Sequence, residues 1–135
     1  MNINKTKILK IILYLGAVYY IIGAIAHFFG LTIFPFYDGA LYTPYHDTVI
    51  SLVAIVLSMV LYTVARNPEK NIDIINVMII GGIIAIIFSI GVVWKIDFVS
   101  LGAPAKKGQT IVEAILLTMY VILLIIFKPN HSNKL

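Results

Sequence analysis

The chain alternates long apolar runs with short polar segments. Each of four runs is close to or above the roughly 20 residues that a helix needs to cross the hydrocarbon core of a bilayer. Their residue ranges are 8–30, 47–65, 68–94 and 110–127. Because backbone groups in lipid must bond within the chain, runs of this length predict helices. We therefore expect an all-α integral membrane protein, a single domain over residues 1–135 with four transmembrane helices in a compact antiparallel bundle.

Three polar segments carry signals for a helix start. Thr43 followed by Pro44 is a typical N-cap and first helical residue for the second span. Asn67 and Pro68 repeat that pattern before the third span. The segment 110–113, "TIVE", has the spacing of a capping box, in which its glutamate would close the start of the fourth helix.

Composition agrees with a membrane protein and excludes several functions. Hydrophobic residues make up 61% of the chain and charged residues 12%, about half the charged fraction of an ordinary soluble domain. The chain has no cysteine, which excludes disulfide, thiol-redox and thiolate-metal chemistry. The net charge of +4 does not indicate nucleic-acid binding, since the basic residues are scattered at the ends of the apolar runs.

The distribution of basic residues predicts the orientation. With four spans, both termini and the segment 66–73 share one side of the membrane, and the two other loops share the opposite, outer side. The first side holds Lys5, Lys7, Lys10, Arg66, Lys70, Lys128 and Lys134, against Lys95, Lys106 and Lys107 on the outer side. The excess of basic residues predicts that both termini lie in the cytoplasm of a cell with this protein in its membrane.

Small and polar residues recur at helical spacing in every span, and such stripes mark the faces along which membrane helices pack. The stripes are Gly16, Tyr20, Gly23, His27 and Gly30; Asp47, Ser51, Ala54 and Ser58; Gly81, Ala85 and Ser89; and Glu113, Leu117 and Tyr120. We expect these faces to meet at a shared centre, with Gly23 in a close helix contact. Membrane lipid is one expected partner. A stripe that docks another membrane subunit, or a second copy of the chain, is the alternative use.

Most non-basic ionisable groups fall on the outer side. The expected ligand-binding residues are His27, His46, Asp47 and Glu113, with Tyr20 and Tyr120 beneath them. Ionisable groups within spans are costly and usually face the bundle interior, so they are functional candidates by default. The intervening loop, "LTIFPFYDGALYTPY", is rich in aromatic residues and is expected to lie at the headgroup level.

Each of these residues also has a structural explanation. Asp47 and Glu113 would each stabilise the start of their own helix, His46 would lie at the interface, and His27 would bond a neighbouring helix. As an alternative, the two histidines and two carboxylates could be ligands of a zinc or iron ion, although no HExxH or ExxH spacing supports a metal site. A haem between the histidines has still less support.

Two classes of function follow. One is a membrane protein with an outward-facing polar pocket, acting as a subunit of a complex or as a binder of a small ligand. The other is a membrane-embedded enzyme that acts at the outer leaflet on a lipid or a quinone-like substrate, by acid–base or metal chemistry of histidine and carboxylate groups. The sequence assigns no cofactor and no catalytic residue. A proton channel is disfavoured because no ionisable group continues the path toward the cytoplasmic side.

Overall fold

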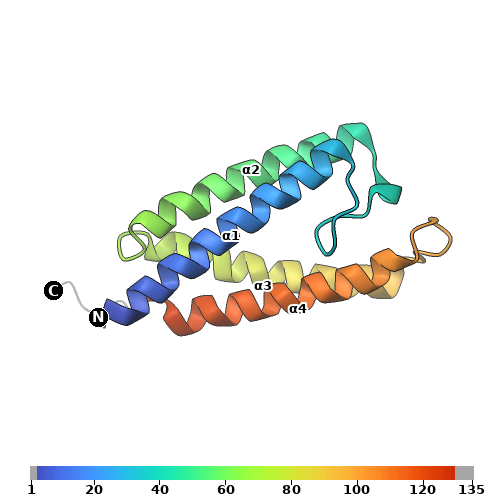
Figure 1. Cartoon of the computed structure of the whole chain (residues 1–135). Coiled ribbons are helices and arrows are strands. Elements are labelled where there is room, and N and C mark those ends of the chain that lie inside the picture. The colour runs from blue at the N-terminus through green and yellow to red at the C-terminus, as the bar shows by residue number, and fades with distance from the viewer. Residues whose placement is uncertain (1–2, 130–135) are drawn as a thin grey trace.

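The computed structural model describes residues 3–129 and is all-α (Figure 1). Its helices are α1 (Ile3–Phe29), the short 3-10 helix η1 (Gly39–Leu41), α2 (Pro44–Arg66), α3 (Ile72–Lys95) and α4 (Ala105–Phe127). The four α-helices pack together, and each is long and apolar enough to cross a membrane. Figure 1 places the start of α1, the turn 67–71 and the end of α4 at one end of the molecule, here called the terminal end. The segments 30–43 and 96–104 lie at the opposite end, here called the loop end.

Of the three helix starts predicted from the sequence, one is confirmed and two are wrong. Thr43 is the N-cap of α2 with Pro44 as its first residue, as predicted, although the Thr43 hydroxyl makes no capping bond. Asn67 caps the C-terminus of α2 instead of starting the next helix. Residues 68–71 form a turn, and α3 begins at Ile72, because the backbone N–H groups of residues 70 and 71 bond back to the carbonyls of residues 67 and 68. Helix α4 begins at Ala105, five residues before the predicted span.

Helices α1 and α2 are joined by serine side chains. The Ser58 hydroxyl donates to the Ala17 carbonyl at 2.9 Å, and the Ser51 hydroxyl donates to the Ala24 carbonyl at 2.8 Å. Both steps are seven residues, so the same contact repeats after two turns. Buried Ala54 lies between the two serines on the same helix face. Small side chains therefore bring the two backbones close enough for side chain to carbonyl bonds, as is typical of packing in lipid.

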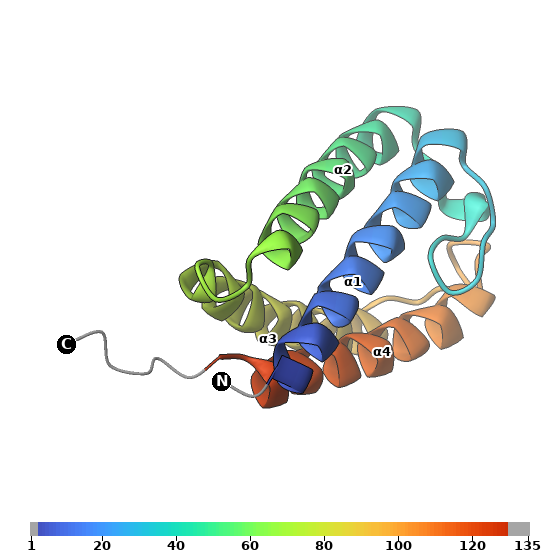
Figure 2. The same ribbon diagram turned by 60° about the vertical axis from the view of Figure 1, so that its left-hand side comes forward.

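The apolar core lies in the half of the molecule nearer the terminal end. Its buried residues are Leu9, Ile12, Leu13, Ala17, Leu61, Val64, Ala65, Ile75, Ile79, Val121 and Leu124. Figures 1 and 2 show that the α1–α2 pair and the α3–α4 pair meet at this end and diverge toward the loop end. The packing that holds the four helices together is therefore concentrated near the terminal end.

Two glycines make close helix contacts. Gly16 joins α1 to α4 and was in a predicted stripe, whereas Gly82 joins α3 to α4 and was not. Gly16 faces the Tyr120 ring so closely that a side chain would collide with it, and Gly82 stands in the same relation to Val121. The prediction for Gly23 was wrong, because a β-carbon there would meet nothing within 4 Å. Gly81 also faces open space, so α3 packs through the face of Gly82. The stripe predicted on α3, which begins at Gly81, is therefore displaced by one residue from the face that packs on α4.

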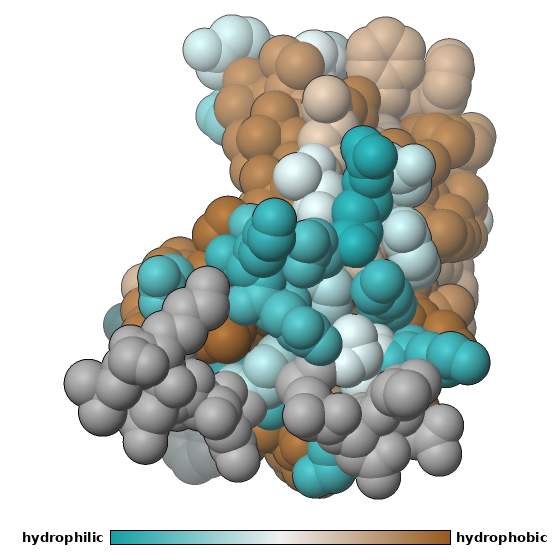
Figure 3. All heavy atoms as spheres, turned by 90° about the vertical axis from the view of Figure 1, so that its left-hand side faces the viewer, coloured by the Kyte–Doolittle hydropathy of each residue, from teal (hydrophilic) through white to brown (hydrophobic). Residues whose placement is uncertain are grey.

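The surface has the distribution expected in a bilayer. Along the helices large apolar side chains are exposed on the outside, and α3 has only Ile75 and Ile79 buried. Hydrophilic side chains gather at the terminal end between apolar flanks (Figure 3). Lipid tails would cover the apolar flanks, and the polar end would lie in the headgroup region and water.

The first loop (residues 30–43) folds back into the space between the diverging helix pairs (Figure 2). The ring centroids of Phe36 and Tyr19 are 4.7 Å apart, and Tyr19 lies about 15 Å below the end of α1 by the rise of a helix. The reversal uses Gly30 at a φ of 63° and Gly39, which passes directly against the Gly30 carbonyl. The loop thus lies alongside the second half of α1, and its expected place at the headgroup level stays a prediction.

Candidate functional site

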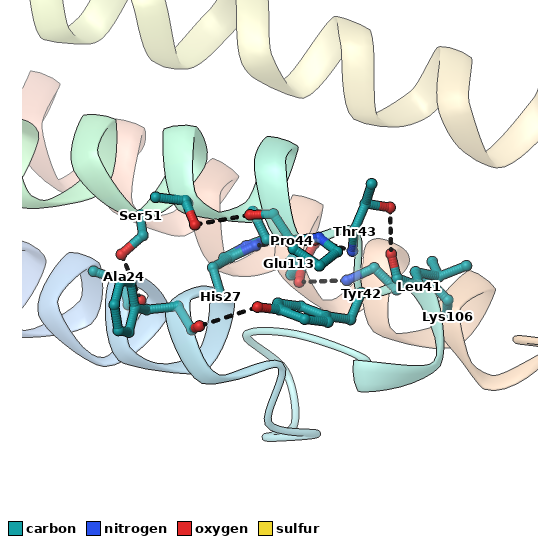
Figure 4. Close-up of polar contacts among 12 residues, drawn as sticks. Ala24, His27, Leu41, Tyr42, Thr43, Pro44, Ser51, Lys106 and Glu113 are labelled. Carbon is teal, nitrogen blue, oxygen red and sulfur yellow. Dashed lines mark hydrogen bonds and ion pairs between the residues drawn. The ribbon is translucent and has the colours of Figure 1, made fainter.

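The central contact at the loop end joins His27 of α1, labelled in Figure 4, to Asp47 of α2. The Nδ1 atom of His27 lies 2.7 Å from Oδ1 of Asp47. Since a carboxylate only accepts, the imidazole N–H is the donor in this bond. The side chain of Asp47 is 6% exposed and that of His27 is 20% exposed. The pair is therefore shielded on the Asp47 side and open to its surroundings on the histidine side.

Asp47 is held from a second direction by its own helix start. Its Oδ2 atom accepts a hydrogen bond from the backbone N–H of Thr43, which would otherwise lack a partner at the N-cap. The helix dipole also favours a carboxylate in this first turn. Both oxygens of Asp47 are thus occupied, one by the helix cap and one by the histidine. Asp47 therefore caps its own helix, as predicted, and also bonds His27, whereas the predicted cluster of this pair with Glu113 is not supported.

Tyr37, an aromatic residue of the first loop, completes the surroundings of His27. Its ring centroid lies 4.3 Å from that of the imidazole, and its hydroxyl is buried with no hydrogen bond among the described residues. Burial, together with the nearby Asp47 carboxylate, raises the pKa of the Tyr37 phenol above its ordinary value. Spacing alone could not have found this contact, because it depends on the fold-back of the first loop.

Glu113 forms a second ionic pair at this end, within α4. Its Oε1 atom lies 3.2 Å from Nζ of Lys106, seven residues earlier on the same helix. The predicted capping box is wrong: α4 starts at Ala105, so Thr110 lies inside the helix and its hydroxyl bonds the Lys106 carbonyl at 2.9 Å. Among residues 3–129, no hydrogen bond joins the Glu113–Lys106 pair to the His27–Asp47 pair.

The remaining candidates lie apart from the His27–Asp47 pair. His46 is exposed and its ring stands edge-on to Tyr45 at 5.5 Å. Tyr20 and Tyr120 pack against the apolar core, and the buried Tyr120 hydroxyl has no hydrogen-bond partner in the described part of the chain. Consecutive side chains on an α-helix are rotated by about 100° around its axis, which explains why His46 and Asp47 point in different directions.

The arrangement does not favour a metal centre. Within residues 3–129, no three histidine or acidic side chains come together as metal ligands would. Asp47 already has both oxygens engaged, Glu113 is paired with Lys106, and exposed His46 does not join His27. The set of two histidines and two carboxylates is therefore not assembled, and a haem between the two histidines has no support from this geometry.

The histidine can still do chemistry of another kind. An imidazole whose Nδ1 is fixed by a carboxylate keeps one orientation and one tautomer, and presents Nε2 to a partner. Nε2 of His27 has no hydrogen bond among the described residues. The arrangement suits a hydrogen bond to a ligand, or a proton transfer.

Comparison of the chain with protein-family models, with curated proteins and with solved structures finds no match.

Proposed function

We propose that this chain is a small multi-pass protein of the cell membrane that binds a small ligand at its loop end. The observation that carries the proposal is the 2.7 Å bond between His27 and Asp47. It fixes an imidazole that is one-fifth exposed and leaves its second nitrogen without a partner in the described chain. A purely structural tie would use a smaller polar residue as readily, as Ser51 and Ser58 do on the same pair of helices.

The chemistry around His27 limits the class of ligand. Tyr37 and the apolar flanks of α1 and α2 would favour an apolar body, and the imidazole nitrogen would hydrogen-bond a polar head group. A quinone-like or lipid-derived molecule has both features. In the proposed orientation both termini lie in the cytoplasm with the helices antiparallel, so the ligand reaches the site from the outer leaflet.

A catalytic role at the same site is the second candidate. A histidine oriented by a carboxylate is the arrangement of a general base, and Glu113 of α4 is a further ionisable group at the same end of the molecule. If the site is catalytic, Glu113→Gln abolishes turnover and leaves the fold intact. In a simple binder the same variant retains the ligand.

The ligand itself provides the test. The parent protein, His27→Ala and His46→Ala are purified in parallel, and the small molecules that accompany each are extracted and compared by mass spectrometry, with metal analysis of the same samples. We expect one compound to accompany the parent and His46→Ala and to be lost from His27→Ala. His46 is the matched control because it is a histidine at the same end that lies outside the pair.

A parent protein without any such compound, or equal retention by all three proteins, would refute the binding proposal. The alternative would then be a subunit of a membrane complex or a homo-oligomer, with His27 and Asp47 acting only to join two helices.

A further inference from the structure

A groove of about 470 Å³ runs along the outside of the α1–α2 pair, away from the His27–Asp47 pair. Its lining residues are Tyr14, Ala17, Val18 and Ile21 from α1 and Ser58, Met59, Tyr62 and Thr63 from α2. We refer to it as the α1–α2 groove. It lies in the half of the molecule nearer the terminal end, so it is unrelated to the ligand site proposed above.

Apart from the phenols of Tyr14 and Tyr62, the α1–α2 groove offers a ligand no free polar side chain among the described residues. The Ser58 hydroxyl donates to the Ala17 carbonyl, and the Thr63 hydroxyl donates to the Met59 carbonyl at 2.8 Å. The other lining residues, the two tyrosines excepted, have aliphatic or thioether side chains. A groove whose serine and threonine hydroxyls are already engaged suits hydrocarbon rather than a polar molecule.

The groove ends in aromatic and basic side chains toward the terminal end. Tyr14 and Tyr62 face each other with ring centroids 5.7 Å apart. Lys10 precedes Tyr14 by one helical turn, and Arg66 follows Tyr62 by one turn, so each basic residue extends the same helix face. Neither Lys10 nor Arg66 forms an ion pair within the described residues, whose pairs are those of His27 and Lys106.

The length of this face matches one leaflet. From Lys10 to Ile21 is eleven residues, or about 16 Å along a helix, and half of a bilayer's hydrocarbon core is about 15 Å. Tyrosines favour the boundary between headgroups and tails. The order of groups along the face is therefore base, phenol and hydrocarbon wall, which is the order of phosphate, glycerol and acyl chain in a phospholipid.

We propose that the α1–α2 groove binds an anionic phospholipid from the leaflet on the side of the terminal end. One acyl chain lies in the groove, and the phosphate contacts Lys10 and Arg66. The charge at this end supports an anionic rather than a zwitterionic lipid. Among the described residues it holds Lys5, Lys7, Lys10, Arg66, Lys70 and Lys128 against Glu69 and Asp73, and the Glu69 carboxylate accepts a bond from Thr6 at 3.2 Å.

Native mass spectrometry of the full chain released from bilayer nanodiscs tests the proposal. The nanodiscs contain phosphatidylglycerol and phosphatidylcholine with identical acyl chains but distinguishable masses. We expect the parent protein to retain phosphatidylglycerol preferentially. Lys10→Gln and Arg66→Gln should each lower that preference about fivefold, since a basic residue near an anionic surface contributes about that much to binding. Lys95→Gln, at the loop end, is the matched control and should leave it unchanged.

A second pair of variants tests the hydrocarbon part of the site. Val18→Trp places a large ring in the groove and should abolish retention of the lipid, whereas Val53→Trp lies outside the groove and should not. Val53 is a fair control because the two valines are exposed to the same degree, 55% and 53%. Helix content from circular dichroism checks that each variant folds. Equal retention of the two lipids by the parent, or a preference that survives both Arg66→Gln and Val18→Trp, would overturn the proposal.

Discussion

At the scale of single residues, the His27–Asp47 bond decides how the loop end is organised. Asp47 serves its own helix through the Thr43 N–H and the neighbouring helix through the imidazole. Residue type and helical phase predicted that these two side chains would face inward. They could not predict Tyr37, whose position depends on the path of the first loop, or Lys106, whose pairing with Glu113 depends on where α4 begins.

A double-mutant cycle measures this bond. His27→Ala, Asp47→Ala and the double variant should show a coupling free energy of unfolding of about 1 to 2 kcal/mol, because a shielded, charge-assisted bond joins the two helices. The measurement is unfolding in mixed micelles. The cycle of His46→Ala with Asp47→Ala should show a coupling near zero. A coupling near zero in both cycles would mean that the His27–Asp47 contact does not form in the folded protein.

At the scale of elements, the apolar runs predicted that four helices exist, and their ends were set by local bonds that the runs do not encode. Helix α4 extends five residues earlier than its apolar run, through Lys106, Lys107 and Gly108, since charged residues near a helix end can reach the interface. The pairing of faces was also only partly predictable. A stripe of small residues on α3 was evident, but adjacent glycines made its phase ambiguous between Gly81 and Gly82.

These adjacent glycines supply a matched experiment. Gly82→Ala should lower the free energy of unfolding by about 1 kcal/mol or more, because its methyl group would collide with Val121, a residue with a stiff side chain. Gly81→Ala should be neutral or slightly stabilising, since its methyl group meets nothing within 4 Å. Unfolding of the two variants in mixed micelles gives the comparison. Equal stability, or a less stable Gly81→Ala, would show that α3 packs on α4 through a different face.

At the scale of the whole molecule, the helices join tightly at the terminal end and diverge at the loop end, where the first loop occupies the space between the pairs. Composition predicted the membrane class, and the lengths of the apolar runs predicted the number of spans, because both are properties of the sequence itself. The distribution of the core was not predictable, since it depends on which helix faces meet.

The orientation proposed from the basic residues has a direct test. A cytoplasm-dependent fluorescent reporter fused after Leu135 should be active, because seven of the ten basic residues lie on that side. The same reporter inserted after Gly102, in the segment between α3 and α4, should be inactive, and a periplasm-dependent enzyme there should be active. The reverse pattern would contradict cytoplasmic termini.

The measurement closest to the central proposal is the accessibility of position 27 from the outer side. The chain has no cysteine, so single-cysteine variants need no background correction. His27→Cys, Thr32→Cys and Ala54→Cys are exposed in intact cells to a membrane-impermeant thiol reagent. An outward-facing site predicts that His27→Cys reacts, as exposed Thr32→Cys in the first loop does, and that buried Ala54→Cys does not. A His27→Cys variant that stays unreactive while Thr32→Cys is labelled, or that reacts only after the membrane is permeabilised, would contradict the proposed site.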